Sequence, residues 1–266
     1  SWQQLEDAFV ANMRSATPAI IILLLIGAIA GTWMASGVIP TLIYYGLKIL
    51  SPSIFLPASC IICAIVSLLT GSSWTTIATI GVALMGIGRA LGFEDGWIAG
   101  AIISGAYFGD KISLMSDTTV LASSTAEVPL FKHIQYMMIT TTPSLIIALI
   151  VFTISGLSAS PASAADTAMI ETALQSTFNI TPWLLIVPVL TAVLISRRLP
   201  AIVTLFASAA MAAIAMVIAQ SDILMSIVGE GSLDFMSSLK AVILAATTDT
   251  AVETGNALLN ELVATS

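Results

Sequence analysis

The sequence predicts an all-α integral membrane protein, a polytopic helical bundle with a re-entrant hairpin and a discontinuous transmembrane helix. Of its 266 residues, 58% are hydrophobic and only 9% are charged, and the mean hydropathy is +1.03. Soluble domains carry about a quarter charged residues. Several apolar runs approach the roughly 20 residues that cross a bilayer. Polar clusters interrupt two of the apolar regions, at 71–76 and at 110–119.

The N-terminal part predicts an amphipathic segment, 1–15, followed by a first span over 16–35. We assign residues 16–266 to a single membrane transport domain. The chain starts with Ser1 and stops soon after a polar, helix-like run. We therefore expect it to be part of a longer transporter, with this domain incomplete. A Ser/Ala-rich stretch, 158–181, is expected to be a loop.

Residues 54–91 are predicted to turn back on themselves. At 1.5 Å per residue, one helix over this stretch would be much longer than a bilayer is thick. Each arm has only about 15 residues, which is short for a full span. We predict a re-entrant hairpin with Gly71–Thr76 at its tip. Two short spans joined by a polar turn are the alternative.

The second polar cluster predicts a broken helix over 96–126. Asp110, Lys111 and Asp117 lie there between strongly apolar flanks. Ionisable side chains in a membrane segment cost several kcal/mol and usually line a cavity or an ion path. Unwound backbone at membrane depth is tolerated only where protein or a water-filled cavity covers it. The cluster therefore predicts an ion-binding break in the helix.

The two interruptions together predict a cation site, because Ser73-Trp-Thr-Thr resembles Ser116-Asp-Thr-Thr. Secondary transporters build their sites from pairs of short, interrupted segments. Na⁺ is a hard cation that suits oxygen ligands, and a buried carboxylate can hold either Na⁺ or a proton. Asp117 is the first candidate, because hydroxyls flank it. The candidate ligands are Asp117, Asp110, Ser116, Thr118, Ser72, Ser73, Thr75 and Thr76.

Other roles stay open for the charged residues. Asp110 is a second ligand or the partner of Lys111, and Lys111 is expected to balance charge, because an ammonium cannot coordinate a cation. A structural ion pair of Lys111 with either aspartate is the alternative. Cys60 and Cys63 lie in wholly apolar surroundings and are interpreted as packing residues. We expect no cofactor besides the transported Na⁺ and H⁺.

The basic residues predict an orientation. Cytoplasmic loops carry an excess of Lys and Arg, which places the Arg197-Arg198 loop in the cytoplasm. The net charge of −7 implies no nucleic-acid partner. The surrounding partner is membrane lipid, and a homodimer stays open. One face of the membrane is expected to hold Arg14, Lys132, Arg197 and Arg198, and the other Lys48, Arg89 and Lys240.

The segments Gly71-Ser-Ser-Trp-Thr-Thr and Gly100-Ala-Ile-Ile-Ser-Gly-Ala-Tyr-Phe-Gly-Asp-Lys-Ile-Ser-Leu-Met-Ser-Asp-Thr-Thr resemble the NhaC family of Na⁺/H⁺ antiporters. The resemblance extends over about 16–156. It implies a multi-pass carrier of the bacterial cell inner membrane, within the ion-transporter superfamily, built from inverted repeats with paired hairpins. Some relatives exchange malate and lactate together with Na⁺ and H⁺. The sequence departs from the family pattern at Leu114-Met115 and at Val120.

The leading functional hypothesis is therefore not an enzyme but a secondary active transporter that exchanges Na⁺ for H⁺ by alternating access. The first alternative is a Na⁺-coupled carboxylate exchanger of the malate/lactate type, in which Lys111 or helix N-termini hold the anion. A second alternative is an intramembrane aspartyl protease with Tyr107-Phe-Gly-Asp as its catalytic element, but two aspartates seven residues apart form the required close pair poorly. A non-transporting scaffold leaves the buried charges unexplained.

Overall fold

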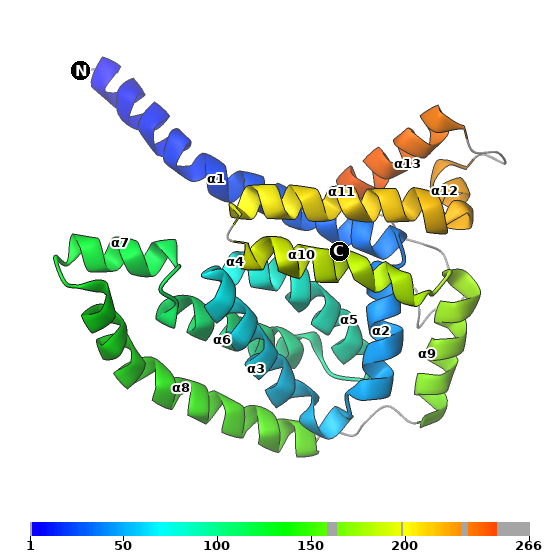
Figure 1. The fold of residues 1–266 in the computed structure, drawn as a ribbon, viewed down its shortest axis with the longest axis horizontal. Coiled ribbons are helices and arrows are strands. Elements are labelled where there is room, and N and C mark those ends of the chain that lie inside the picture. The colour runs from blue at the N-terminus through cyan, green and yellow to red at the C-terminus, as the bar shows by residue number, and fades with distance from the viewer. Residues whose placement is uncertain (1, 159–163, 198, 230–233, 249–266) are drawn as a thin grey trace.

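The structure is a computed structural model that describes residues 2–158, 164–197, 199–229 and 234–248. Every regular element in these ranges is a helix (Figure 1). Three helices are long and apolar enough to cross a membrane: α3 (Pro52–Thr70), α8 (Leu130–Ser158) and α11 (Ala201–Ala219). Two bent helix pairs raise this number to five if each pair is one span. The all-α, multi-pass membrane fold is confirmed.

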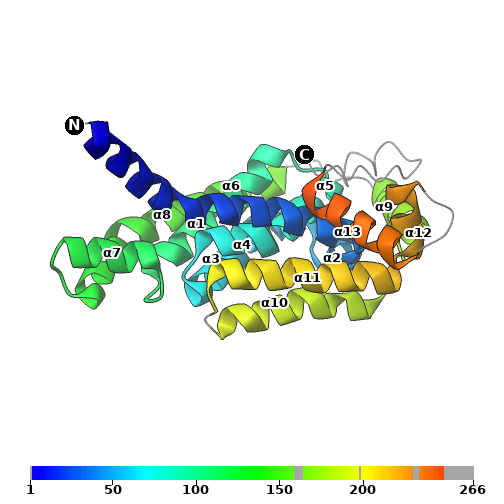
Figure 2. The ribbon, with the colours of Figure 1, turned by 90° about the horizontal axis from the view of Figure 1, so that it is seen from above.

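The N-terminal region is one long helix that ends in a sharp bend. Helix α1 runs from Trp2 to Ala35, so the predicted boundary at residue 15 is not a break in secondary structure. Its first turns project away from the body of the molecule (Figures 1 and 2). Gly37 has φ 78° and redirects the chain into α2 (Val38–Ile49). The bend between residues 20–35 of α1 and α2 is 71°.

The chain reverses after α3, as the predicted hairpin requires. Gly71 has φ 68°, and a second arm follows that consists of α4 (Ser73–Thr76), a π-helical turn (Ile77–Gly81) and α5 (Val82–Ala90). At the base of the hairpin the Phe55 and Phe93 rings stack with centroids 5.6 Å apart. The first arm has 19 residues, which is longer than the predicted length.

Helix α6 (Asp95–Ile112) packs directly on α3. A Cβ added at Gly105 would collide with the backbone carbonyl of Cys60, and one added at Gly109 with that of Ala64. Only glycine therefore permits this backbone-to-backbone approach. Both cysteines are free and buried in this contact region, in agreement with their predicted packing role.

A break over 113–116 separates α6 from α7 (Asp117–Thr125). The predicted break is confirmed, although Asp110 still lies in the last turn of α6. Helix α8 then returns beside α3 and α6, so that a Cβ at Gly156 would lie 2.8 Å from the Ser53 carbonyl oxygen.

The C-terminal half adds a second group of helices. The stretch expected to be a loop contains α9 (Ala164–Thr177), so that expectation is wrong. Helices α10 (Ile186–Ser196) and α11 lie side by side (Figure 2). Two buried hydrogen bonds meet at Ser208 of α11: Trp33 Nε1 of α1 donates to its Oγ at 3.1 Å, and Thr191 Oγ1 of α10 lies 2.9 Å from it. Helices α12 (Ser221–Val228) and α13 (Phe235–Thr247) complete the described chain.

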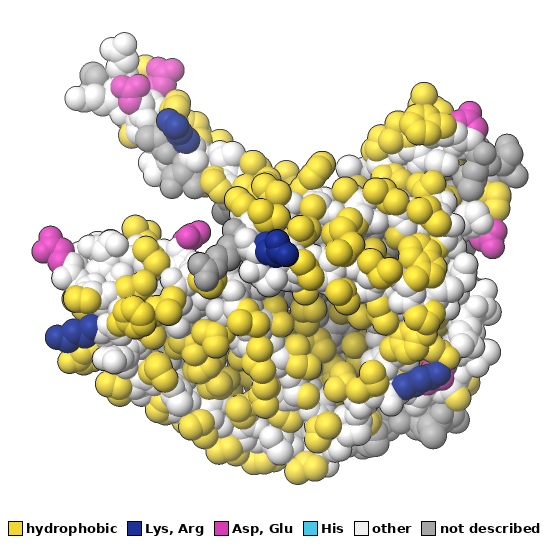
Figure 3. Space-filling model, viewed as in Figure 1, with side chains coloured by type: hydrophobic (Ala, Val, Ile, Leu, Met, Phe, Trp, Pro, Cys, Tyr) yellow, Lys and Arg dark blue, Asp and Glu magenta, His cyan; other side chains and the backbone are white. Residues whose placement is uncertain are grey.

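The surface of the bundle suits a lipid environment. Hydrophobic side chains are spread over the whole face in Figure 3, and the charged side chains visible there are few and lie mainly toward its margins. Helix α8 is the clearest case, because its most apolar window is only 6% buried within the chain. Apolar side chains on this helix therefore face outward, where hydrocarbon would surround them.

Candidate functional site

The two predicted interruptions meet in space. A Cβ added at Gly71, at the hairpin tip, would lie 2.6 Å from the backbone carbonyl carbon of Met115 in the α6–α7 break. Ser113 Oγ donates a hydrogen bond to the Leu68 carbonyl oxygen at 2.8 Å. The breaks therefore form one continuous feature, although more than 40 residues separate them in the sequence.

Beside this contact lies a cavity of about 400 Å³, which we call the break cavity. It is bounded by the hairpin tip, the α6–α7 break, α1, the end of α10 and the start of α11. Its lining residues are Ile22, Thr70, Gly71, Ser72, Trp74, Thr75, Asp110, Met115, Ser116, Asp117, Thr118, Ile195, Leu199, Pro200, Ala201 and Thr204.

Asp110 is the buried carboxylate of the break cavity. It is only 8% exposed, and its Oδ2 accepts a hydrogen bond from Ser73 Oγ at 2.9 Å. This bond joins α6 to the hairpin tip. A carboxylate has about four acceptor positions, so a single hydrogen bond leaves oxygen lone pairs for a cation.

Asp117 occupies a more open position. It is the first residue of α7, its side chain is exposed, and it lines the same cavity as Asp110. Ser116 caps α7 by accepting from the Thr119 backbone N–H at 3.4 Å, and its hydroxyl lies 2.7 Å from the Thr118 hydroxyl. An acidic residue in the first helical turn is also stabilised by the helix dipole, so Asp117 has a structural role available as well.

The hydroxyls of the hairpin tip divide into two groups. Ser72 and Thr75 line the cavity, and the Ser72 Oγ accepts from the Thr75 backbone N–H at 3.2 Å and from its Oγ1 at 3.0 Å. Thr76 is fully buried and donates to the Ser72 carbonyl oxygen at 2.9 Å. Ser73 reaches the site through Asp110. The structure thus gathers six of the eight candidates on the cavity wall, with Ser73 and Thr76 behind it.

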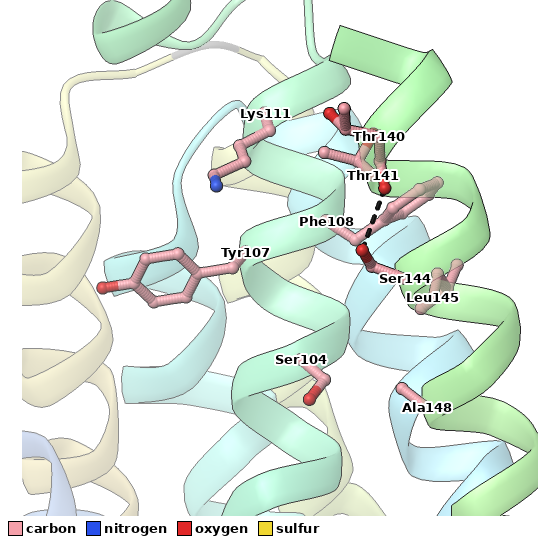
Figure 4. A pocket seen from close by; sticks show the side chains of 9 residues that line it. All are labelled: Ser104, Tyr107, Phe108, Lys111, Thr140, Thr141, Ser144, Leu145 and Ala148. Atoms are coloured by element: carbon pink, nitrogen blue, oxygen red, sulfur yellow. Dashed lines mark hydrogen bonds between the residues drawn. The ribbon is translucent and has the colours of Figure 1, made fainter.

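Lys111 faces away from this cavity. It lines a different pocket, between α6 and α8, together with Ser104, Tyr107, Phe108 and hydroxyls of α8 (Figure 4). In Figure 4 the Lys111 and Tyr107 side chains project to the same side of α6. The ion pair between Arg89 and Asp95 is the one recorded among the described residues, so Lys111 forms none with Asp110 or Asp117. No direct contact with either aspartate therefore supports its predicted charge-balancing role.

Thr204 is a cavity residue that the sequence did not indicate. It comes from the first turns of α11, is 1% exposed, and lines the break cavity. A single threonine in an apolar run after Pro200 carries no distinguishing pattern. Its position follows from how α11 packs on α1.

Interrupted helices that enclose a polar cavity with a buried carboxylate, in a multi-pass bundle, are typical of secondary membrane transporters. Comparison with known proteins agrees. The chain matches the Na⁺/H⁺ antiporter family over residues 1–106 and 105–264, and it belongs to this family. No solved structure gives a significant match.

Three relatives illustrate the range of the family. A malate-2H⁺/Na⁺-lactate antiporter of Bacillus subtilis is 42% identical over 83% of this chain and 47% of its own length. The Na⁺/H⁺ antiporter NhaC of Alkalihalophilus pseudofirmus is 44% identical over 76% of this chain and 44% of its own length. An arginine/ornithine antiporter of Halobacterium salinarum is 35% identical over 77% of this chain and 43% of its own length.

The chain spans about half the length of the curated relatives it matches. These relatives are antiporters and not enzymes, which removes the aspartyl protease alternative. The predicted resemblance to the NhaC family is confirmed.

Proposed function

We propose that the full-length protein exchanges Na⁺ for H⁺ across the membrane by alternating access, with the break cavity as the cation site. The observation that carries the proposal is Asp110, a buried carboxylate with a single recorded side-chain hydrogen bond, in a cavity with hydroxyls from both helix breaks. Oxygen ligands of this kind suit a hard cation such as Na⁺.

The exchange follows from competition at one carboxylate. A carboxylate oxygen that coordinates a cation cannot carry a proton at the same time. Na⁺ and H⁺ therefore exclude each other at Asp110, and the site carries one or the other when it changes its exposure. The irregular backbone at 113–116 and around Gly71 adds carbonyl oxygens near the same cavity.

Within this site we assign the primary ligand role to Asp110 and the secondary role to Asp117. The sequence alone favoured the opposite order, because hydroxyls flank Asp117 on both sides. Burial and the Ser73 hydrogen bond support the new order, since Asp117 is exposed. Ser72, Thr75, Ser116 and Thr118 supply further oxygen atoms.

The decisive experiment measures Na⁺-driven dissipation of a pH gradient in proteoliposomes with the full-length protein. We expect Asp110→Asn to reduce this flux to the level of empty vesicles and Asp117→Asn to weaken Na⁺ affinity while leaving measurable flux. Glu94→Gln, at the far end of α6, is the control and should transport normally, because Glu94 lies outside the cavity lining. Full flux in Asp110→Asn would remove the proposed mechanism.

A Na⁺-coupled carboxylate exchanger is the second candidate function. The names of two relatives include malate, lactate, arginine and ornithine, and each of these molecules carries a carboxylate. The cavity volume of about 400 Å³ supports this candidate as well, because small-molecule sites occupy roughly 300–1,000 Å³. Proteoliposome flux with and without malate or lactate separates the two candidates.

We further propose a bacterial inner membrane location with the α10–α11 loop in the cytoplasm. Arg197 follows the last residue of α10, two residues after the cavity-lining Ile195, whereas Arg198 lies outside the described residues. Both cysteines of this chain are buried, so Arg197→Cys, in a full-length protein freed of any other accessible cysteine, provides a specific label. Labelling of intact cells by a membrane-impermeant maleimide, before permeabilisation, would place this loop on the outer side of the membrane and overturn the proposed orientation.

A further inference from the structure

A second hollow of the molecule, which we call the α6–α8 groove, is lined by other residues than the break cavity. It is the pocket of Figure 4, with a volume of about 390 Å³ between α6 and α8. Lys111 and Tyr107 of α6 line it, and both side chains are exposed. Among the described residues, no Asp or Glu lines the groove and none forms an ion pair with Lys111. The groove therefore holds a positive charge that the described part of the chain leaves without a counterion.

The groove lies beside the middle of a helix that is long enough to span a membrane. Helix α8 runs from Leu130 to Ser158, and its residues that line the groove lie between Thr140 and Ala148. At 1.5 Å per residue, roughly 15 Å of helix continues on either side of the groove. Ionisable side chains within membrane segments almost always face the interior of a bundle or a water-filled cavity, where they find a partner. Lipid is therefore an unfavourable neighbour for Lys111.

The α8 side of the groove suits a closely packed helix. Thr140, Ser144 and Ala148 line it at intervals of four residues, so they lie on one face of α8. Small residues at this spacing let membrane helices approach each other closely. The hydroxyls of Thr140 and Ser144 donate to carbonyl oxygens of α8 itself, at 3.1 and 2.9 Å, so these two side chains need no partner in the groove. The charge of Lys111 is then the group that a docking helix has to match.

We propose that the α6–α8 groove is the docking surface for a membrane helix of the full-length protein that lies outside these 266 residues and presents an Asp or Glu side chain to Lys111. This chain spans 47% and 44% of the lengths of two relatives, so a protein of their size has about as many residues again to pack against it. A carboxylate matches the groove because hydrogen bonds between an ammonium and a carboxylate are charge-assisted and strong. The inference concerns the assembly of the full-length protein and does not depend on Na⁺ binding in the break cavity.

A second copy of this chain matches the groove less well. The three described helices that are long and apolar enough to span a membrane, α3, α8 and α11, contain no Asp or Glu. Asp110 is buried and lines the break cavity, so it is not available to a neighbouring molecule. Any of these three helices from a second copy would leave the Lys111 ammonium unpaired at membrane depth, as lipid tails would. Charge complementarity therefore favours a helix from the rest of the full-length protein.

The first experiment replaces Tyr107 of the full-length protein by the photo-crosslinker p-benzoylphenylalanine, another aromatic side chain, and illuminates it in native membranes. Tyr107 is 47% exposed and lines the groove, so the crosslinker reaches whatever covers this surface. Peptide mapping by mass spectrometry then identifies the captured segment. Ile147→p-benzoylphenylalanine is the matched control, because Ile147 is 62% exposed on α8 but lies outside the groove lining.

We expect Tyr107→p-benzoylphenylalanine to capture, within the same polypeptide, a membrane helix that lies outside the 266 residues and contains an Asp or Glu. The Ile147 variant should not capture this helix. Adducts with lipid alone, with the groove's own helices alone or with a second copy of the protein overturn the proposal. So does a captured helix without an acidic residue, or equal capture of the same helix by both variants.

A second measurement tests the charge at Lys111 without a crosslinker. Lys111→Met keeps the length of the side chain and removes its charge, which leaves the partner carboxylate unpaired in the groove. We expect the Tm of the full-length protein in detergent to fall for Lys111→Met and to stay near the wild-type value for Lys111→Arg. Lys132→Met is the control, because Lys132 is exposed near the start of α8 and lies outside the groove lining. An unchanged or higher Tm in Lys111→Met overturns the proposal.

The captured helix provides a direct check of the ion pair. In the Lys111→Met background, replacement of its Asp or Glu by the corresponding amide removes the unpaired charge, so part of the lost Tm should return. Two residues in contact are expected to show such non-additive effects. A double variant whose loss of Tm equals the sum of the two single losses overturns the pairing with Lys111.

Discussion

Helices are interrupted in two regions of this protein, and the two regions differ in how the polar groups at the break find hydrogen-bond partners. One is the break cavity. The other, which we call the Gln220 node, joins the bend at Ser36-Gly37, the start of the α9–α10 bend at Asn179, and the end of α11. Gln220 is 2% exposed. Its Nε2 donates to the Ser36 and Asn179 carbonyl oxygens at 3.3 and 3.2 Å, and its Oε1 accepts from the Asn179 N–H at 3.1 Å.

The difference separates a structural break from a functional one. At the Gln220 node a single side chain satisfies the freed backbone groups of two distant segments, and no charged residue takes part. At the break cavity Ser72 and Ser116 cap the helices that follow them, yet the Asp110 carboxylate, which lines the cavity, keeps acceptor positions free beside its bond to Ser73. An interrupted helix alone does not indicate a transport site. A buried polar side chain that lines a cavity and still has free ligand positions does.

The largest expected effect tests the structural side of this comparison. Gln220→Ala removes the partners of three backbone groups, of which the Ser36 carbonyl is buried and the two of Asn179 are partly buried, and an unsatisfied buried group costs about 1–3 kcal/mol. We expect a loss of roughly 3–5 kcal/mol in unfolding free energy, read as a lower Tm in detergent. Gln175→Ala is the control, because its bond to the Tyr44 hydroxyl is exposed. A changed Na⁺ affinity in the folded Gln220→Ala protein would contradict a purely structural node.

The next effect concerns the contact that carries Asp110. Gly105→Ala would force α6 away from the α3 backbone at Cys60, and overpacking of this kind costs about 1–3 kcal/mol. Because α6 holds Asp110 against Ser73, Na⁺-driven flux should fall together with Tm. Gly96→Ala is the matched control, since its added Cβ meets nothing within 4 Å. Equal behaviour of the two variants would show that close α3–α6 packing is not required.

A smaller effect sharpens the functional side. Ser73→Ala removes the hydrogen bond to Asp110 while leaving the carboxylate in place. A hydrogen bond to a charged group contributes about 1.5–3 kcal/mol, so we expect the Na⁺ concentration for half-maximal flux to shift about tenfold or more. Ser59→Ala serves as control, because Ser59 lies outside the cavity lining and its buried Oγ has no partner among the described residues. An unchanged Na⁺ response in Ser73→Ala would place the cation elsewhere.

The smallest effect lies at the α5–α6 turn, outside both regions. Arg89 donates two hydrogen bonds to Asp95, at 2.7 and 2.8 Å, and this holds the pKa of Asp95 below its usual value of 3.8. The stabilisation is present above pH 3.8 and is lost as the pH falls through the lowered pKa of the folded state. The pair is exposed, so Asp95→Asn should cost less than about 1 kcal/mol. The Tm difference from wild type should shrink on acidification below pH 4, and a constant difference would exclude a charge effect.

Much of the local structure was predictable because it depends on residue types that are close together in the sequence. Gly71–Thr76 and 113–116 interrupt apolar runs with residues that cap helices, and both became helix breaks. The bend at Gly37 and helix α9 were not predicted. Gly37 lies within a mostly apolar run, and the Ser/Ala-rich composition around α9 also suits a loop.

The candidate site shows the same division. The sequence indicated both aspartates and the hydroxyls near them, but it favoured Asp117 because flanking hydroxyls are a local signal. Burial of Asp110 depends on the hairpin tip, 37 residues away along the chain. The sequence around Asp110 therefore does not predict that contact.

By itself, the sequence determined the membrane class, the two interruptions and the family resemblance, since hydropathy and polar clusters act over a few residues. Tertiary structure alone decided that the interruptions touch through Gly71 and Met115, that Gln220 bonds to the backbone at the other bend, and that Asp110 is buried beside Ser73. The physical reason is that buried polar groups must find partners or ligands, and which partner is near depends on how distant helices pack.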